Sequence, residues 1–224
     1  MITENDPAGM GIAFANAINE HTEHSCRLVT TKTRYHFEFE KDIHVPDLDE
    51  EGIDEIVSLL NRADIIHFHI LADEQIRLGP IKVKDYISGK ALLNHHHGHP
   101  DFRSNPHKYR EKYRALGRKV LVSTPDLLKL VPEATWQPNL VPIEAPLYRP
   151  LQSGGNGKVR ICQSPTRKDL KNTSEFLAVM EVIRRSYRDL EIVILDDALH
   201  IKCLETKQRC DIHFDHLQGY YGVS

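Results

Sequence analysis

KVRICQSPTRKDLKN, residues 158–172, is the stretch that most constrains the fold. Its first half alternates apolar and polar residues over 159–162, which predicts a short β-strand. Pro165 ends this strand, and Asn172 offers an N-cap for a helix whose apolar positions recur at helical spacing over 176–187. The stretch therefore predicts a strand, a loop and a helix N-terminus, in that order.

The loop between this strand and this helix is basic and suits a bound phosphate. Arg167, Lys168 and Lys171 carry positive charge, and Ser164 adds a hydroxyl. A helix N-terminus contributes free N–H groups and the positive end of the helix dipole. On composition alone, an ordinary strand–helix loop with solvated lysines is the more common explanation, so both interpretations stay open.

The composition is that of a globular protein with one large domain or two small ones. The chain has 224 residues, of which 40% are hydrophobic and 27% charged, with a net charge of −3. Without a basic excess, nucleic acid is not an expected partner. No apolar run approaches the ~18 residues of a transmembrane helix, and the first residues do not resemble a signal peptide. Four dispersed cysteines without a CxxC pair indicate reduced thiols, so we expect a cytoplasmic location.

The N-terminal segment predicts the opening of a Rossmann-type unit. Residues 1–3 resemble the end of a strand, NDPAGMG at 5–11 a tight loop, and 12–21 an amphipathic helix. Gly9 and Gly11 would let backbone N–H groups approach a ligand closely, although two glycines more often mark a simple tight turn.

Strands alternate with helices along the rest of the chain. We expect strands at 27–31, 35–39, 63–69, 90–94, 119–123 and 191–195, helices at 49–61, 105–116, 124–130 and 200–209, and short helical turns at 75–87 broken by Gly79-Pro80. This alternation predicts an α/β fold with a parallel sheet in each half.

Several of these segments together resemble GT-B glycosyltransferases of the family 4 type. The pattern Ser164-Pro165-x-Arg167-x-x-x-Lys171-x-Thr173 resembles that family's donor-phosphate loop, with Asn172 in place of the usual glycine. Further similar segments are NDPAGMG (5–11), ADIIHFH (63–69), HHHGHPDFR (95–103), WQPN (136–139), CDIHFDH (210–216) and GYYGVS (219–224). The resemblance covers nearly the whole chain. It ends before the family's Glu-x7-Glu segment, whose carboxylates bind the donor ribose and sugar, so we expect the second domain to be incomplete.

The resemblance implies two Rossmann-like domains, an acceptor-side domain over 1–148 and a partial nucleotide-sugar-binding domain over 149–224. It implies retaining hexosyl transfer from a nucleotide-diphosphate sugar to an acceptor hydroxyl, with neither metal nor cofactor. Such enzymes serve polysaccharide biosynthesis, so a glycan or lipid-linked acceptor is expected. A basic helix face at Arg184, Arg185 and Arg188 could touch anionic lipid headgroups at the inner membrane face, although an ordinary solvated face is the more common explanation.

The resemblance also implies roles for individual residues. It assigns the donor side to Ser164, Arg167, Lys171, Gly9 and Gly11, the catalytic position to His97, and the acceptor side to Asp101, Arg103 and His69.

The fourteen histidines allow other functions. His67 and His69 stand two residues apart on an expected strand and so face the same side, and four more histidines lie within 95–99. Because imidazole is a good Zn²⁺ ligand, a metal-dependent hydrolase is one alternative, although no carboxylate stands at a clear ligand spacing and Asp101 is expected in a loop. The same histidines could instead line a polar cleft, or be ordinary surface and core residues. A non-catalytic module that binds nucleotide or a partner is a further alternative, because the Glu-x7-Glu segment is absent.

Overall fold

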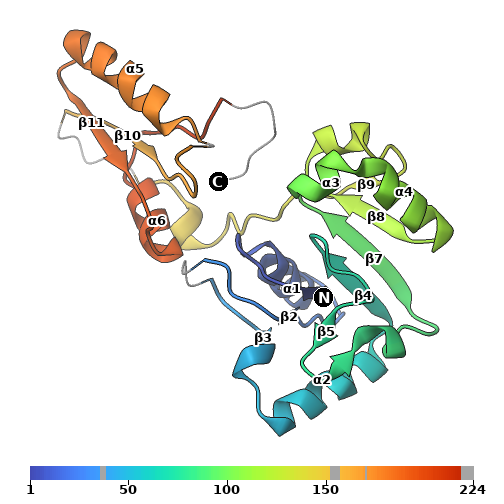
Figure 1. Ribbon diagram of the computed structural model, residues 1–224. Helices are drawn as coiled ribbons and strands as arrows, with labels where there is room; N and C mark the ends of the chain where they lie inside the picture. Colours follow the sequence, from blue (N-terminus) through green and yellow to red (C-terminus); the bar gives the residue numbers. More distant parts are fainter. Residues whose placement is uncertain (36–38, 152–156, 170, 218–224) are drawn as a thin grey trace. The chain divides into compact units, whose positions relative to one another are not determined.

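The computed structural model describes residues 1–35, 39–151, 157–169 and 171–217 (Figure 1). The chain divides into two compact units, the first comprising Met1–Tyr35 and Phe39–Val141, and the second beginning at Pro142. The boundary expected after residue 148 falls inside the second unit. Each unit is described by itself below.

The first unit is built on a parallel sheet whose strand order reverses beside its first strand. Its strands are β1 (Ile2–Thr3), β2 (Val29–Thr30), β3 (Ile43–His44), β4 (Ile65–His69), β7 (Ala91–His96), β8 (Lys119–Val122) and β9 (Thr135–Trp136). Their spatial order is β3-β2-β1-β4-β7-β8-β9, and every neighbouring pair is parallel. The chain runs outward from β1 to β3 and then returns to place β4 on the other side of β1. That reversal is the topological switch point at which α/β sheets bind ligands.

Helices connect these strands. They are α1 (Met10–His21), α2 (Glu50–Arg62), α3 (Pro100–Ser104) and α4 (Pro106–Ala115), with 3-10 turns η1 (Val45–Asp47), η2 (Val83–Tyr86) and η3 (Pro125–Lys129). The start of α2 shows why the sequence forms a helix there. Asp49 is its N-cap and accepts a hydrogen bond from the Gly52 N–H at 3.0 Å, and two acidic residues follow in the first turn.

Strand β4 separates two different environments. Its alternation places Ile66 and Phe68 on one face, where they form a core with Ile56 and Leu60 of α2. His67 and His69 lie on the opposite face, where Phe14 of α1 packs edge-on against both rings. All four strand residues from 66 to 69 are buried, as is typical of a parallel strand covered on both faces.

The second unit carries its own small parallel sheet. Its elements are η4 (Pro146–Tyr148), β10 (Val159–Gln163), α5 (Thr173–Ser186), β11 (Leu190–Ile194), α6 (His200–Lys207) and β12 (Ile212–His213), with strand order β11-β10-β12. Cys162, Phe176 and Met180 are its buried apolar residues among those described, and the Phe176 ring stacks on Phe214 with centroids 4.9 Å apart. The predicted sequence of strand, loop and helix over residues 158–187 is therefore confirmed.

The α/β prediction with a parallel sheet in each half is also confirmed, but several local predictions are wrong. Residues 75–87 form an antiparallel hairpin, β5 (Arg77–Leu78) with β6 (Ile81–Lys82), before the short η2 turn. Gly79 takes a φ of 62°, a left-handed conformation that suits a hairpin turn and not a helix. Residues 125–129 form a 3-10 helix in place of an α-helix, and β3 and β9 were not predicted. The strand predicted at 35–39 and the segment 219–224 lie mostly or wholly outside the described residues.

None of the described helices combines the length and the apolarity that crossing a membrane requires.

Replacing Phe68 with alanine should strongly destabilise the first unit, because its ring is fully buried in the core beside α2. We expect Phe68→Ala to lower the free energy of unfolding by about 3–5 kcal/mol. Urea unfolding followed by the fluorescence of Trp136, the chain's one tryptophan, measures this in the same unit. Ile65→Ala on the same strand is the matched control, because Ile65 is 56% exposed and its loss should cost about 0.5 kcal/mol or less. Equal losses in the two variants would contradict this account of the core.

Candidate functional site

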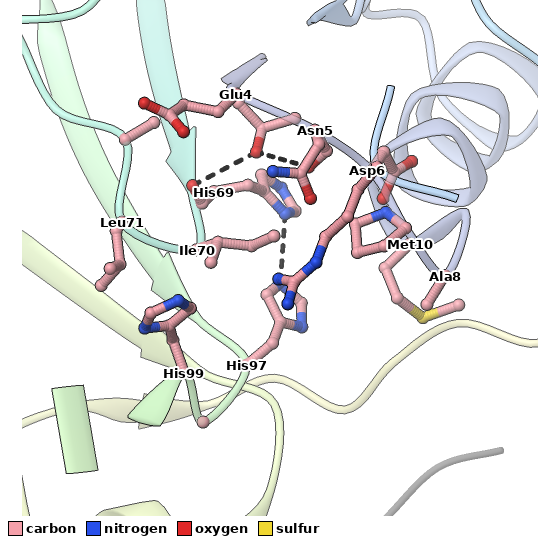
Figure 2. Close-up of a pocket in the computed structure, with 15 residues that line it drawn as sticks. Glu4, Asn5, Asp6, Ala8, Met10, His69, Ile70, Leu71, His97 and His99 are labelled. Atoms are coloured by element: carbon pink, nitrogen blue, oxygen red, sulfur yellow. Dashed lines mark hydrogen bonds between the residues drawn. The ribbon is translucent and has the colours of Figure 1, made fainter. Parts of the chain in front are cut away.

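A cavity of about 390 Å³ lies at the switch point of the first unit (Figure 2). It is lined by the segments that end or follow β1, β4 and β7, namely residues 3–8, 69–72 and 97–99, together with Met10 and Arg34. The carboxyl ends of parallel strands meet at one edge of a sheet, which explains why segments so far apart in sequence converge here. Because these segments carry histidine, asparagine and carboxylate side chains, the cavity can bind a polar small molecule.

The backbone leaving β4 is strained at this cavity. Ile70 takes a φ of 62°, a conformation that is costly for a β-branched residue, by about 1–3 kcal/mol. Its N–H donates to the carbonyl oxygen of His95 at 2.8 Å, which ties the turn to β7. Strain of this kind persists where the surrounding structure enforces it, as at many ligand sites.

The glycine loop at the start of α1 is occupied by the chain's own carboxylate. The Asp6 side chain accepts hydrogen bonds from the N–H groups of Gly11 at 3.0 Å and Ile12 at 2.9 Å. Gly9 has a φ of 66°, and a Cβ there would lie 2.6 Å from Phe39 Cδ1, so glycine is required for conformation and for space. Neither Gly9 nor Gly11 lines the cavity. In this structure the Gly11 N–H is engaged by Asp6, which sequence reasoning missed, so the donor-side role of the two glycines stays a prediction.

A chain of hydrogen bonds connects His69 to Asn139 through His97. His69 Nδ1 lies 3.1 Å from His97 Nε2, as the dashed line in Figure 2 shows, and His97 Nδ1 lies 3.1 Å from Asn139 Oδ1. Burial lowers the pKa of His97 to about 4, although its bond to Asn139 acts in the opposite direction. His97 is therefore neutral at physiological pH, with both ring nitrogens engaged. His69 and His97 both line the cavity, which is consistent with the polar cleft that the sequence left open as one interpretation.

His67 and His95 complete a histidine cluster behind the cavity. The ring centroids of His67 and His69 lie 4.4 Å apart, and that of His95 lies 5.4 Å and 5.0 Å from them. Phe14 packs edge-on against all three rings. Burial lowers the pKa of His67 to about 3 and of His95 to about 2, and it also lowers the pKa of His69. The cluster is therefore uncharged at neutral pH.

Asp101 and Arg103 do not line the cavity, so their predicted place on the acceptor side is not supported. Asp101 lies in the first turn of α3 and not in a loop, and its carboxylate accepts a hydrogen bond from the Tyr109 hydroxyl. Arg103 donates to the Gly98 carbonyl oxygen at 3.0 Å and pairs with Asp126 at 2.6 Å. Arg103 instead holds the segment after β7 to η3, and Asp101 joins the start of α3 to α4. The contacts of Arg103 with Gly98 and Asp126 thereby help to position His97 and His99 beside the cavity.

The phosphate-loop candidates of the second unit lie together at the end of β10. Ser164 Oγ lies 3.3 Å from His213 Nε2, and Lys171 Nζ donates to Asp215 Oδ1 at 2.7 Å. Asn172 begins α5 with a φ of 52°, which explains how asparagine can stand where glycine is usual. The predicted loop and helix N-terminus are thus adjacent.

The loop is less basic than the sequence suggested, because each of its cations faces a carboxylate. Arg167 pairs with Asp169, Lys168 with Asp196, and Lys171 with Asp215. The side chains of Arg167 and Asp169 are 57% and 60% exposed, so this pair contributes little free energy and can exchange for another anion. Lys171 is 16% exposed, and its ion pair joins the loop to the segment after β12. Arg167 is therefore the more available of the two predicted phosphate ligands.

No protein-family model matches the chain, and no curated protein matches it significantly. The resemblance to GT-B glycosyltransferases therefore stays a prediction.

The buried histidines should make the first unit sensitive to acid. In the unfolded chain they bind protons below about pH 6.5, whereas folding holds the pKa of His97 at about 4 and that of His95 at about 2. The unfolded state thus binds more protons in this window, so the free energy of unfolding should fall as the pH is lowered from 6.5 towards 4. Each such histidine contributes up to about 1.4 kcal/mol per pH unit.

Urea unfolding at a series of pH values, followed by Trp136 fluorescence, checks this expectation. His95→Gln should reduce the pH slope by about one histidine's contribution, whereas His24→Gln, at an exposed position, should leave it unchanged. An identical slope in wild type and His95→Gln would contradict the assignment of a neutral buried imidazole at His95.

Lys171 and Arg167 should differ in what they contribute to stability. Lys171→Met removes the ammonium partner of the part-buried Asp215, so we expect a loss of about 1–3 kcal/mol in the second unit. Arg167→Met removes an exposed pair and should cost about 0.5 kcal/mol or less. Hydrogen exchange of the α5 amides measures both. A larger effect at Arg167 would contradict the difference in burial described above.

Proposed function

We propose that this protein is a GT-B-type glycosyltransferase that moves a sugar from a nucleotide-diphosphate donor to an acceptor hydroxyl. The observation that carries the proposal is the position of the cavity. It lies at the switch point of a Rossmann-like parallel sheet and is lined by the segments that resemble the family's loop and histidine motifs. The second parallel sheet, with its loop and helix N-terminus, supports the two-domain reading.

In the proposed reaction, the bond between the anomeric carbon and the diphosphate oxygen breaks, and a bond to the acceptor oxygen forms. The departing diphosphate gains negative charge and takes up the acceptor's proton. Stabilising that charge is the main electrostatic task of the site. It requires fixed cations and N–H groups, and in this proposal it requires neither a metal nor a cofactor.

The second unit would bind the donor diphosphate. Arg167 can exchange Asp169 for a phosphate oxygen at small cost, because that ion pair is exposed. The N-terminus of α5 adds the positive end of its dipole, and Ser164 adds a hydroxyl at the end of β10. Lys171 would hold the loop in shape through Asp215 while adding positive charge.

The first unit would position the acceptor. His97 is neutral, so it cannot act as a general acid at physiological pH, but its ring nitrogens can exchange a hydrogen bond with a sugar or acceptor hydroxyl. His69 lies 3.1 Å from it and shares the cavity. Arg34 and Asp6 add one cation and one carboxylate to the cavity lining, which suits a ligand with several hydroxyl groups.

Calorimetric titration with UDP, GDP and ADP in the presence of chelator tests the proposal. We expect saturable binding of one diphosphate, weakened about 10- to 100-fold in Arg167→Ala because one charge-assisted contact is lost. Lys202→Ala, which removes an exposed cation from α6, is the matched control and should bind as wild type does. His97→Ala should leave this binding unchanged while abolishing sugar transfer.

Two results would count against the proposal. If no nucleoside diphosphate binds, the proposed donor site is contradicted. If Arg167→Ala and Lys202→Ala lose affinity equally, binding depends on the overall positive charge and not on Arg167. Binding that depends on Arg167 without any hydrolysis or transfer of a nucleotide sugar would favour the non-catalytic nucleotide-binding module.

A further inference from the structure

Three histidines of the first unit converge on one face of the sheet. His67 and His69 alternate onto the same face of β4, and the parallel register places His95 of β7 directly beside His69. Their relative exposures are 8%, 2% and 0%. One ring nitrogen from each lies within 4.8 Å of the other two. The strand pairing thus gathers three imidazoles that are separated by up to 28 positions in the sequence.

The nitrogens of this cluster lack the hydrogen bonds that buried polar atoms normally make. Within the described part of the chain, His67 Nε2, His69 Nε2 and both ring nitrogens of His95 are buried without a hydrogen-bond partner. An unsatisfied buried polar atom costs about 1–3 kcal/mol, so such atoms are rare unless they serve a ligand. The neighbouring His96 differs in that its Nε2 pairs with the Tyr113 hydroxyl at 2.6 Å, so that only its Nδ1 lacks a partner. Of the twelve such atoms in the described part of the chain, four lie in this cluster, and His95 has neither ring nitrogen satisfied.

The hydrogen-bond chain from Asn139 sets the tautomer of His69. Asn139 Oδ1 can only accept, so His97 carries its proton on Nδ1 and presents a lone pair at Nε2. That lone pair accepts from His69 Nδ1–H, which leaves the lone pair of His69 on Nε2. His69 Nε2 is the atom without a partner. Orientation of a ligating histidine through its other ring nitrogen is a recurring feature of protein metal sites.

We propose that His67, His69 and His95 bind one divalent first-row transition metal ion of the Zn²⁺ class, with His97 and Asn139 orienting His69. Three neutral imidazoles are the ligand set of zinc sites that keep a fourth position open. Tetrahedral Zn²⁺ with Zn–N distances of about 2.0–2.1 Å holds its nitrogens about 3.3 Å apart, so the rings need to close by about 1.5 Å at most. His69 lines the cavity, which provides the path by which the ion enters.

The ligand set also predicts which ions bind. Imidazole suits Zn²⁺, Co²⁺, Ni²⁺ and Cu²⁺, whereas Mg²⁺ and Ca²⁺ require oxygen ligands, which this cluster does not supply. The site does not depend on the proposed function, because the diphosphate ligands lie in the second unit and bind without metal.

Titration of metal-free protein with Co²⁺ and Zn²⁺, by visible absorption and calorimetry, tests the inference. We expect one equivalent of Co²⁺ with the intense visible bands of a four-coordinate site, displaced by Zn²⁺ and unaffected by excess Mg²⁺. His95→Gln should lose this stoichiometric binding. His107→Gln, which removes an exposed histidine from α4, is the matched control and should keep it.

Asn139 provides a second test in a folded variant. Asn139→Leu should weaken Co²⁺ binding about 10- to 100-fold, because His97 and His69 lose their fixed tautomers, while Asn139→Asp, which retains the accepting oxygen, should bind as wild type does. Circular dichroism and thermal unfolding establish that each variant folds. If His95→Gln does not fold, the difference in Co²⁺ affinity between the two Asn139 variants decides whether the proposed metal site exists.

The inference is overturned if folded His95→Gln binds Co²⁺ as wild type does, or if Asn139→Leu and Asn139→Asp bind equally. It is also overturned by a near-ultraviolet thiolate-to-cobalt band, because that would place the ion on the cysteines. Titration with nucleotide diphosphates in chelator is a separate measurement, so failure of the metal site and failure of the donor site are distinguishable.

Discussion

The parallel pairing of β4 with β7 is the constraint on which the first unit depends. Its register runs through five residue pairs, from Ile65 with Ala91 to His69 with His95. Because side chains alternate along a strand, this register sends Phe68 into the core beside α2 and two histidines of β4 to the opposite face. It also brings the ends of both strands to one edge of the sheet, where the cavity lies. A shift by one residue would exchange the two faces and remove both core and cluster.

Burying the histidine face of β4 costs free energy, whereas burying the apolar face of the same strand stabilises the first unit. Imidazoles buried against Phe14 lose their hydration, which explains why the pKa values of the cluster histidines are lowered. The buried ring of Phe68 on the other side of the same strand contributes free energy of the opposite sign. A site with unsatisfied nitrogens persists here because a large core fixes the strands that carry it. Asp6 acts similarly at the start of α1, where its carboxylate satisfies the N–H groups of Gly11 and Ile12.

The candidate site of the second unit contains ion pairs, whereas that of the first unit contains neutral histidines. Its loop cations are matched by carboxylates, so the local field is weaker than the count of lysines and arginines suggests. Exposure then separates Arg167, which can exchange its partner, from Lys171, which helps to hold the loop to the segment after β12. Diphosphate binding in the second unit is therefore proposed from an exchangeable ion pair. Metal binding in the first unit is proposed from neutral nitrogens without hydrogen-bond partners.

The sequence by itself determined the α/β class, the strand–loop–helix at 158–187 and the presence of His69 and His97 at strand ends, because periodicity and turn residues act locally. It failed where partners are distant in sequence. The roles of Arg103 and Lys171, for example, depend on Asp126 and Asp215. The hairpin at 77–82 is a local failure, because it depends on the left-handed conformation of Gly79. Sequence also could not show that Asp6 occupies the helix N-terminus, that Asn139 orients His97, or that His95 stands beside His69. Those relations follow from strand register and chain reversal, which only the folded sheet decides, because it brings together residues whose separation along the chain carries no local signal.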